Sequence, residues 1–163
     1  MSVSNIADIN CAVAKALSVI GEQWSLMILR NVFNGMQTFA ELQKHLGLST
    51  SVLSARLRTL TAAKILERRQ AKEDGRSFEY HLTERGYELY PVLVGLTNWG
   101  EKWMANKRGL RVELVEKRTG KAIQGAVVLA EDGRPLKPWD VEAVPGPGAD
   151  AAINRLLAKR GET

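Results

Sequence analysis

The chain has 163 residues, of which 45% are apolar and 25% charged, so it is long enough for one globular domain with an appendage. Its 23 lysines and arginines outnumber 18 aspartates and glutamates, and the formal net charge of +5 suits a polyanionic partner. One cysteine excludes a disulfide framework within the chain. Because no signal-peptide pattern and no apolar run of about 18 residues is present, we expect a cytoplasmic protein without a membrane segment.

Two helices are expected before residue 36. Apolar residues recur at helical spacing over residues 8–18, and Ile20-Gly21 ends this segment. The same periodicity returns from Glu22 to Phe33, where Asn34-Gly35 ends it.

A helix-turn-helix is expected next. The residues TFAE at 38–41 form a capping box, which predicts that a short helix begins there and covers residues 39–46. Gly47 suits the left-handed conformation that ends a helix, and Ser49 suits the N-cap of a second helix over residues 50–63. Two short helices joined by a tight turn with glycine are typical of this motif.

A β-hairpin follows the two helices. Residues 65–70 and 77–82 alternate between apolar and polar side chains, and Asp74-Gly75 between them is a strong hairpin signal. Residues 36–82 therefore predict a winged helix-turn-helix, and the fold class is mainly α with a β-hairpin wing, an α+β arrangement.

The second helix of this motif has a face suited to the major groove. With Leu53, Leu57 and Leu60 turned inward, the opposite side is small and polar, and no acidic residue lies from Thr50 to Lys64. Small residues permit close approach, hydroxyl groups bond base edges or phosphates, and arginine bonds guanine with two hydrogen bonds. The residues expected to contact double-stranded DNA are Thr38, Ser49, Thr50, Ser51, Ser54, Arg56 and Arg58, with Lys72 and Arg76 from the hairpin loop.

Two other interpretations stay open. A small polar face is also found on helices that contact only solvent, and some winged helices are protein-interaction modules without operator recognition. The order of the motif, its acid-free second helix and its basic hairpin loop favours DNA binding over both. No acid–base pair, activated nucleophile or phosphate-binding loop indicates an enzyme.

A long helix is expected from residue 83 to about residue 105, with a kink or a break near Pro91. Its apolar residues cover more than one face, and a single small core covers only one of them. We therefore expect the remaining face to form a dimer interface. The residues assigned to that interface are Leu89, Leu93, Leu96, Trp99 and Trp103.

The predicted organisation has three parts. Residues 1–107 form the DNA-binding and dimerisation domain, residues 108–148 a small β-rich hairpin extension, and residues 149–163 a tail with a short helix from 149 to 160. The extension contains neither cysteine nor histidine, so we expect no zinc, no other metal and no cofactor.

The chain resembles the HxlR family of winged-helix regulators, which are relatives of the MarR type. The resemblance runs from about Ile9 to Trp103. It implies a homodimer built from the first and last helices of the domain, which binds a pseudo-palindromic operator as a bacterial repressor or activator. The motifs that carry it are Cys11-x-Val13, Ala16-Leu17-x-x-Ile20-Gly21-x-x-Trp24, Phe39-x-Glu41-Leu42, Val52-Leu53-Ser54-x-Arg56-Leu57, Tyr80-x-Leu82-Thr83-x-x-Gly86 and Pro91-Val92-Leu93.

The resemblance also bears on single residues. Cys11 falls at the family's N-terminal cysteine, which in several relatives senses oxidants or electrophiles. The alternative is a buried, inert thiol, since only Lys15 is placed to act as a charge partner. Thr38 stands where the family usually has an arginine, which puts a phosphate contact at that position in doubt. The effector, the operator and the sign of regulation are not predicted.

Overall fold

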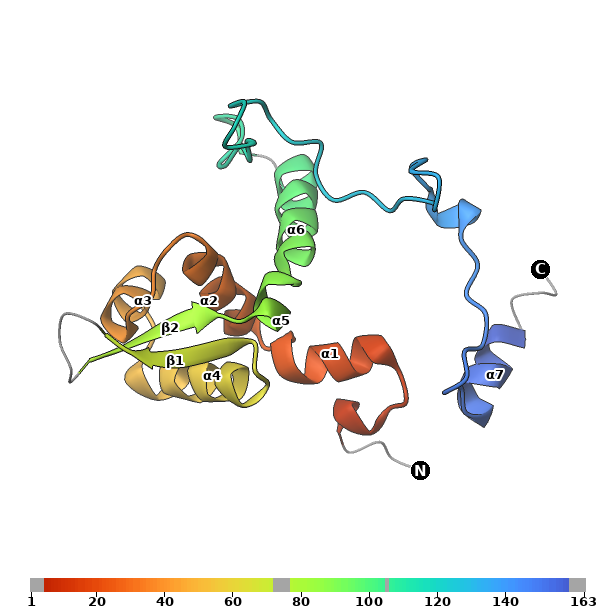
Figure 1. The fold of residues 1–163 in the computed structure, drawn as a ribbon, viewed down its shortest axis with the longest axis horizontal. Coiled ribbons are helices and arrows are strands. Elements are labelled where there is room, and N and C mark those ends of the chain that lie inside the picture. The colour runs from red at the N-terminus through yellow and green to blue at the C-terminus, as the bar shows by residue number, and fades with distance from the viewer. Residues whose placement is uncertain (1–4, 72–76, 105, 159–163) are drawn as a thin grey trace. The chain divides into compact units, whose positions relative to one another are not determined.

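The structure is a computed structural model that describes residues 5–71, 77–104 and 106–158, and it divides into two compact units, residues 1–93 and 94–163. The boundary between the units falls within the last long helix. The elements in chain order are η1 (Ile6–Asp8), α1 (Ala12–Ile20), α2 (Gln23–Phe33), α3 (Phe39–Leu46), α4 (Thr50–Ala62), β1 (Leu66–Gln70), β2 (Phe78–Leu82), α5 (Glu84–Tyr87), α6 (Tyr90–Trp103), η2 (Pro138–Asp140) and α7 (Ala151–Ala158) (Figure 1).

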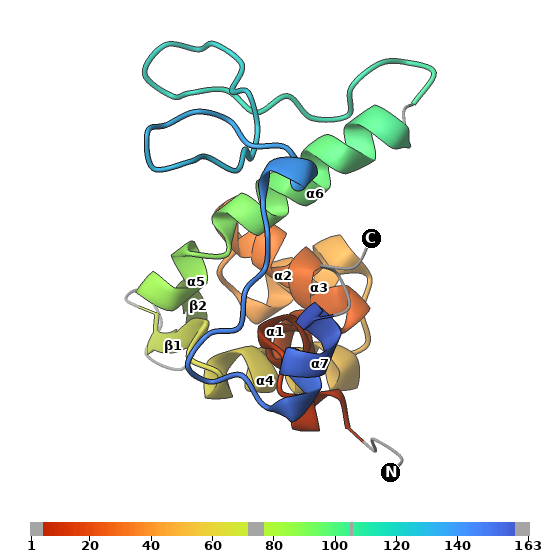
Figure 2. The ribbon, with the colours of Figure 1, turned by 90° about the vertical axis from the view of Figure 1, so that its right-hand side faces the viewer.

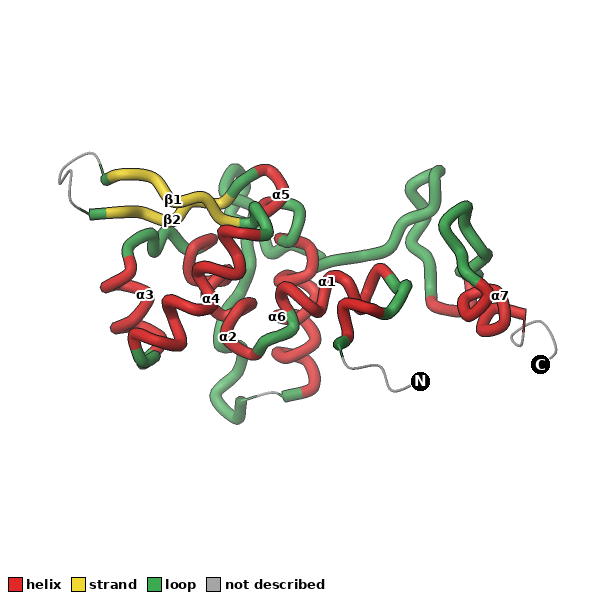
Figure 3. Tube along the Cα trace, turned by 90° about the horizontal axis from the view of Figure 1, so that it is seen from below, coloured by secondary structure: helices red, strands yellow, loops and turns green. Residues whose placement is uncertain are grey.

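The first unit has the winged helix-turn-helix arrangement that the sequence predicts. Helices α2, α3 and α4 contact one another or the hairpin, and the strands β1 and β2 pair antiparallel with Leu66 opposite Leu82 (Figure 1). Figure 3 shows the two strands lying along one side of α3 and α4. In Figure 2 α1 is seen along its axis, and it contacts α2 and α4.

The core of this unit is made by apolar stripes at helical spacing. Leu53, Leu57 and Leu60 of α4 are buried as expected, because positions i, i+4 and i+7 lie on one helical face. They pack with Ile28 and Leu29 of α2, both fully buried. Each such side chain contributes about 1.5–3 kcal/mol when it leaves water. The cluster is completed by Ile20, Val32, Leu42, Leu48, Ile65, Leu66 and Leu82.

The first helix differs from its predicted range of 8–18. Residues 6–8 form a separate 3-10 turn, in which the Asn5 side chain accepts a hydrogen bond of 2.9 Å from the Ala7 N–H. Cys11 is extended, with φ −141°, and acts as the N-cap of α1, which runs to Ile20. The local cap at Asn5 competes with a continuous helix, so α1 begins later and ends later than the apolar pattern suggests.

The predicted long helix over residues 83–105 is broken before Pro91. Helix α5 ends at Tyr87, and α6 begins at Tyr90, which places Pro91 in its first turn. Proline is tolerated there because the N–H of a first-turn residue has no partner within the helix. Phe33 of α2 contacts the rings on both sides of the break, with centroid distances of 5.9 Å to Tyr87 and 5.1 Å to Tyr90.

The second unit is mostly turn and loop after α6, as Figure 3 shows. The expected β-rich extension is reduced to isolated bridges: Val115 pairs with Ala122, and Leu129 pairs with Pro135. Each bridge closes a tight turn, but no neighbouring strand among the described residues extends it. The tail helix α7 forms at 151–158, within the predicted range of 149–160. The predicted domain boundaries remain predictions.

Among the residues that the structure describes, no single helix is long and apolar enough to cross a membrane. Helices α1 and α2 reach the required length and composition only as a pair that is bent by 76°.

Candidate nucleic-acid interface

The turn between α3 and α4 is held by local hydrogen bonds. Gly47 adopts the left-handed conformation, with φ 66°, and Ser49 caps α4 by accepting from the Val52 N–H at 3.3 Å. Gln43 spans the turn, since its amide donates to the Leu48 carbonyl at 3.3 Å and to the Thr50 hydroxyl at 3.0 Å. Gln43 therefore fixes where α4 begins, a role that the sequence did not indicate.

The predicted capping box at the start of α3 is complete. The Thr38 hydroxyl accepts from the Glu41 N–H at 3.2 Å, and the Glu41 carboxylate accepts from the Thr38 N–H at 2.9 Å. These Thr38 hydrogen bonds, and a weaker one from the Gln37 N–H, hold the pKa of Glu41 below its ordinary value. The Thr38 side chain is thus committed to the cap, and we assign it a structural role and not a DNA contact.

One face of α4 is exposed and free of acidic side chains. Thr50, Ser51 and Arg58 are exposed, and Ser54 is half-buried beside them. The Arg58 guanidinium makes no hydrogen bond or ion pair with any residue that the structure describes. A free arginine beside small hydroxyl side chains is the combination that reads base edges in the major groove.

Arg56 is placed differently from the other predicted contacts. Its guanidinium lies 3.5 Å from the carboxylate of Glu22, the N-cap residue of α2, and its side chain is 26% exposed. This ion pair joins the recognition helix to α2. Because the pair neutralises the charge on Arg56, we leave Arg56 out of the proposed DNA-contacting face.

The wing is attached to α4 and α3 at its root. Lys64 follows α4 with φ 56°, a left-handed conformation that turns the chain from the helix into β1. On the other strand, the Tyr80 N–H donates to the Gln37 carbonyl at 2.7 Å, and Thr38 forms a bridge with Glu79. The hairpin therefore has two attachments that orient it relative to the helix-turn-helix.

A notch of about 490 Å³ lies between α4 and the wing. Arg58 lines it from the helix, and Arg68 and Tyr80, which are opposite each other in the hairpin, line it from the strands. The Arg68 guanidinium lies 3.4 Å from the centre of the Phe78 ring, a cation–π contact that orients its charge. Arg68 was missed in the sequence. The alternation of β1, with Glu67 and Arg69 on the other face, was the available signal. Ser54, Leu57, Thr61, Ala62 and Phe39 complete the lining.

Lys72 and Arg76, the two predicted wing-tip contacts, lie outside the described residues.

The residues predicted for a dimer interface fall into two groups. Leu89 and Leu93 are half-buried and pack against the core of the first unit. Leu96, Trp99 and Trp103 are 50%, 55% and 67% exposed along α6. Only the second group is available for a partner.

Helix α1 also carries exposed apolar residues, Val13 and Leu17. Cys11, directly before α1, is an exposed free thiol, so the alternative of a buried thiol does not hold in this chain.

Comparison with known proteins agrees with this geometry. Residues 19–108 match the HxlR-like helix-turn-helix family. The chain is similar to Rv3095, a helix-turn-helix-type transcriptional regulator of Mycobacterium tuberculosis, with 32% identity over 142 residues, 87% of this chain and 90% of the relative. It is also 34% identical over 95 residues to the regulator sll1512 of Synechocystis, which covers 58% of this chain and 70% of that protein.

Two solved structures divide the chain in an informative way. PA1607, a candidate transcription factor, superposes with a TM-score of 0.80 at 37% identity and covers 86% of this chain and 98% of its own. The redox regulator HypR in its oxidised form superposes with a TM-score of 0.52 at 30% identity, covering 56% of this chain but 96% of its own. The part beyond the winged helix is thus shared with PA1607 but has little counterpart in HypR.

Proposed function

Because the chain belongs to the HxlR-like helix-turn-helix family of transcriptional regulators, we propose that it acts as a dimeric, sequence-specific repressor that binds a pseudo-palindromic operator. The observation that carries the proposal is the acid-free face of α4, with the unpaired Arg58 at the edge of a notch that Arg68 lines from the wing. On this proposal α4 lies in the major groove, where Thr50, Ser51, Ser54 and Arg58 contact base edges or phosphates.

The notch suits the duplex backbone that borders the groove. A phosphate located between α4 and the wing meets two guanidinium groups, from Arg58 and Arg68, and the hydroxyls of Ser54 and Tyr80. Contacts of this kind position a protein on DNA without reading its sequence. We therefore assign base reading to the exposed face of α4 and backbone binding to the notch.

The dimer is proposed from the apolar surfaces that the folded chain leaves exposed. Leu96, Trp99 and Trp103 of α6 form one such surface, and Val13 and Leu17 of α1 form another. Two-fold symmetry would place the two α4 helices about 34 Å apart, one duplex turn. A dimer over that span of promoter DNA excludes polymerase from it, so we propose repression.

Fluorescence anisotropy with a labelled duplex tests DNA binding directly. The logarithm of the binding constant should fall by about 0.9 for each tenfold rise in salt and each phosphate neutralised. A substitution that removes charge from α4 without touching its exposed face, Arg56→Gln, is the control. If no duplex bound with a salt dependence, the alternative of a protein-interaction module without operator recognition would be favoured.

We further propose that Cys11 adjusts DNA binding in response to oxidants. Two features support this: the Cys11 thiol is exposed at the start of α1, and the similar protein HypR is a redox regulator. Oxidation of two Cys11 thiols by diamide would form one intersubunit disulfide, and the two electrons and two protons reduce the N=N bond of diamide to a hydrazine. Wild type should then release DNA and Cys11→Ser should not. Equal release by both proteins would exclude the proposal.

A further inference from the structure

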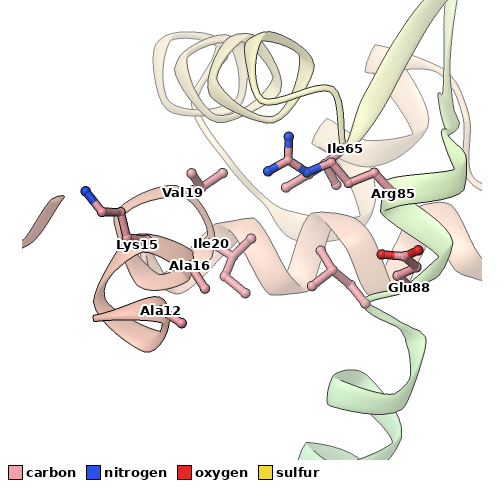
Figure 4. A pocket seen from close by; sticks show the side chains of 9 residues that line it. Ala12, Lys15, Ala16, Val19, Ile20, Ile65, Arg85 and Glu88 are labelled. Atoms are coloured by element: carbon pink, nitrogen blue, oxygen red, sulfur yellow. The ribbon is translucent and has the colours of Figure 1, made fainter. Parts of the chain in front are cut away.

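A cavity of about 460 Å³ lies within the first unit, away from the notch that faces DNA. Its apolar lining comes from Ala12, Ala16 and Val19, which recur along one face of α1, and from Ile65 and Leu89 opposite them. Figure 4 shows this wall of α1 facing Ile65 at the root of the wing. The volume is in the range of about 300–1,000 Å³ that is usual for small-molecule sites.

The charged residues at the rim are unequal in number and in freedom. Arg85 extends from α5 towards α1, and Lys15 lies at the outer edge (Figure 4). Lys15 donates one of its three N–H groups to the Ala7 carbonyl at 2.9 Å, which leaves two. The guanidinium of Arg85 has no partner among the described residues. Against these two cations stands one carboxylate, that of Glu88.

We propose that this cavity binds a small amphipathic carboxylate and that its occupancy changes the affinity for DNA, an inference that rests on the function proposed above. The apolar body lies against Ala12, Ala16 and Val19, and the carboxylate pairs with Arg85. A neutral apolar molecule would leave the guanidinium unused, and a cation would meet two like charges. Charge complementarity therefore selects an anion.

The cavity is connected to the DNA-binding elements through Ile65. This residue directly precedes β1, and its carbonyl accepts from the Thr83 N–H at 3.1 Å. Gly86 of α5 packs so closely on the same carbonyl that a side chain there would collide with it. A ligand between α1 and Ile65 thus contacts the point where α4, the wing and α5 meet. Movement of α1 relative to that point changes the geometry in which α4 is presented to DNA.

A second copy of the chain is the competing occupant of this cavity. The cavity uses the face of α1 that carries Ala12, Ala16 and Val19, whereas the exposed Val13 and Leu17 lie on the adjoining face. A partner seated on Val13 and Leu17 therefore leaves the lining of the cavity to a ligand. If the cavity were instead filled by the partner, Ala16→Phe would change the oligomeric state and not the affinity for a small molecule.

The first test is calorimetric titration of the full chain, without DNA, with 2-naphthoate as the probe. Its neutral amide, 2-naphthamide, has the same skeleton and serves as the comparison. Arg85→Gln should weaken 2-naphthoate binding by about tenfold or more, because a charge-assisted hydrogen bond is lost, and should leave 2-naphthamide binding unchanged. Glu88→Gln should tighten 2-naphthoate binding severalfold. Ala16→Phe should abolish the binding of both.

Two matched controls separate the cavity from general electrostatics. Lys44→Gln removes a positive charge on α3, and Glu84→Gln removes a negative charge from the first turn of α5, which lies outside the lining. Neither should change the affinity for 2-naphthoate. Equal effects of Glu84→Gln and Glu88→Gln, or equal binding by wild type and Arg85→Gln, would overturn the proposed site.

The second test measures coupling to DNA. Saturating 2-naphthoate should change the dissociation constant of a DNA duplex by at least about fivefold, and by linkage DNA should change 2-naphthoate affinity by the same factor. Arg85→Gln should show neither change at the same probe concentration. Binding of 2-naphthoate without any change in DNA affinity would overturn the coupling. Because the titration without DNA is independent of operator recognition, failure of the proposed function would not be mistaken for failure of the site.

Discussion

Arg56 and Glu22 form an ion pair, with 3.5 Å between guanidinium nitrogen and carboxylate oxygen, and this pair joins the recognition helix to the start of α2. Arg58, two residues further along α4, has no such partner among the described residues. The two arginines lie on one short helix but on different faces, so one helps to position the helix and the other is available to DNA.

Replacing Arg58 with alanine should reduce discrimination between an operator and unrelated DNA by about 1–3 kcal/mol, because a two-bond contact with a base is lost. Arg56→Ala is the control. It should leave discrimination unchanged and lower the free energy of unfolding by at most about 1 kcal/mol, the usual worth of a partly exposed ion pair. Anisotropy titrations with two duplexes measure the first effect, and urea denaturation measures the second. Equal loss of discrimination in both variants would mean that the reading face is misplaced.

Arg68 should contribute to binding of any duplex. Arg68→Ala removes one phosphate contact from the notch, so the slope of log K against log salt should become shallower by about 0.9. Arg69 lies on the opposite side of β1, where it pairs with Glu67, and Arg69→Ala should leave the slope unchanged. Titrations at four or more salt concentrations measure both slopes. A sequence-dependent loss in Arg68→Ala would show that this residue reads bases instead.

The capping box should make stability depend on pH in one direction. The pKa of Glu41 is lower in the folded chain than its ordinary value of 4.5, so its contribution is complete above that value and is lost as pH falls through the folded pKa. Wild type should therefore lose stability relative to Glu41→Gln when the pH falls from about 6 to below 4. Thr38→Ala should cost about 1 kcal/mol at neutral pH. Urea midpoints at several pH values measure both effects, and parallel pH profiles for wild type and Glu41→Gln would contradict the assignment.

The apolar surface of α6 should determine oligomeric state. Wild type should sediment with about twice the 18.0 kDa mass of one chain, and Trp99→Glu should sediment as a monomer because it places a charge in the middle of that surface. Trp139, in the second unit, is 81% exposed, so Trp139→Glu is a matched control that should remain dimeric. A wild-type monomer at all concentrations up to those used for DNA binding would exclude the proposed interface.

Short-range signals made the helix-turn-helix predictable. The capping box at Thr38 and Glu41 and the left-handed Gly47 act within a few residues, and α3 has its predicted bounds while α4 differs by one residue. The apolar spacing of α4 likewise predicted which leucines would be buried. Such features depend on local geometry, which the order of residues specifies directly.

Tertiary partners made the site less predictable. Whether Arg56 or Arg58 is free depends on Glu22, which lies in an earlier helix, and Arg68 is oriented by Phe78 on the opposite strand. No pattern within α4 separates the two arginines. The first helix and the extension differ for a related reason, because the Asn5 cap and the isolated bridges result from competition between weak local preferences.

Selection of duplexes from a random pool by the full chain tests recognition by α4 most directly. The proposed function predicts enrichment of a pseudo-palindrome whose half-sites are centred about 10 base pairs apart. It also predicts that Arg58→Ala relaxes preference at defined positions in both half-sites, while Arg56→Ala selects the same sequence as wild type. Retention of DNA without enrichment of any sequence, or an identical enriched sequence with Arg58→Ala, would contradict sequence recognition through this face of the helix.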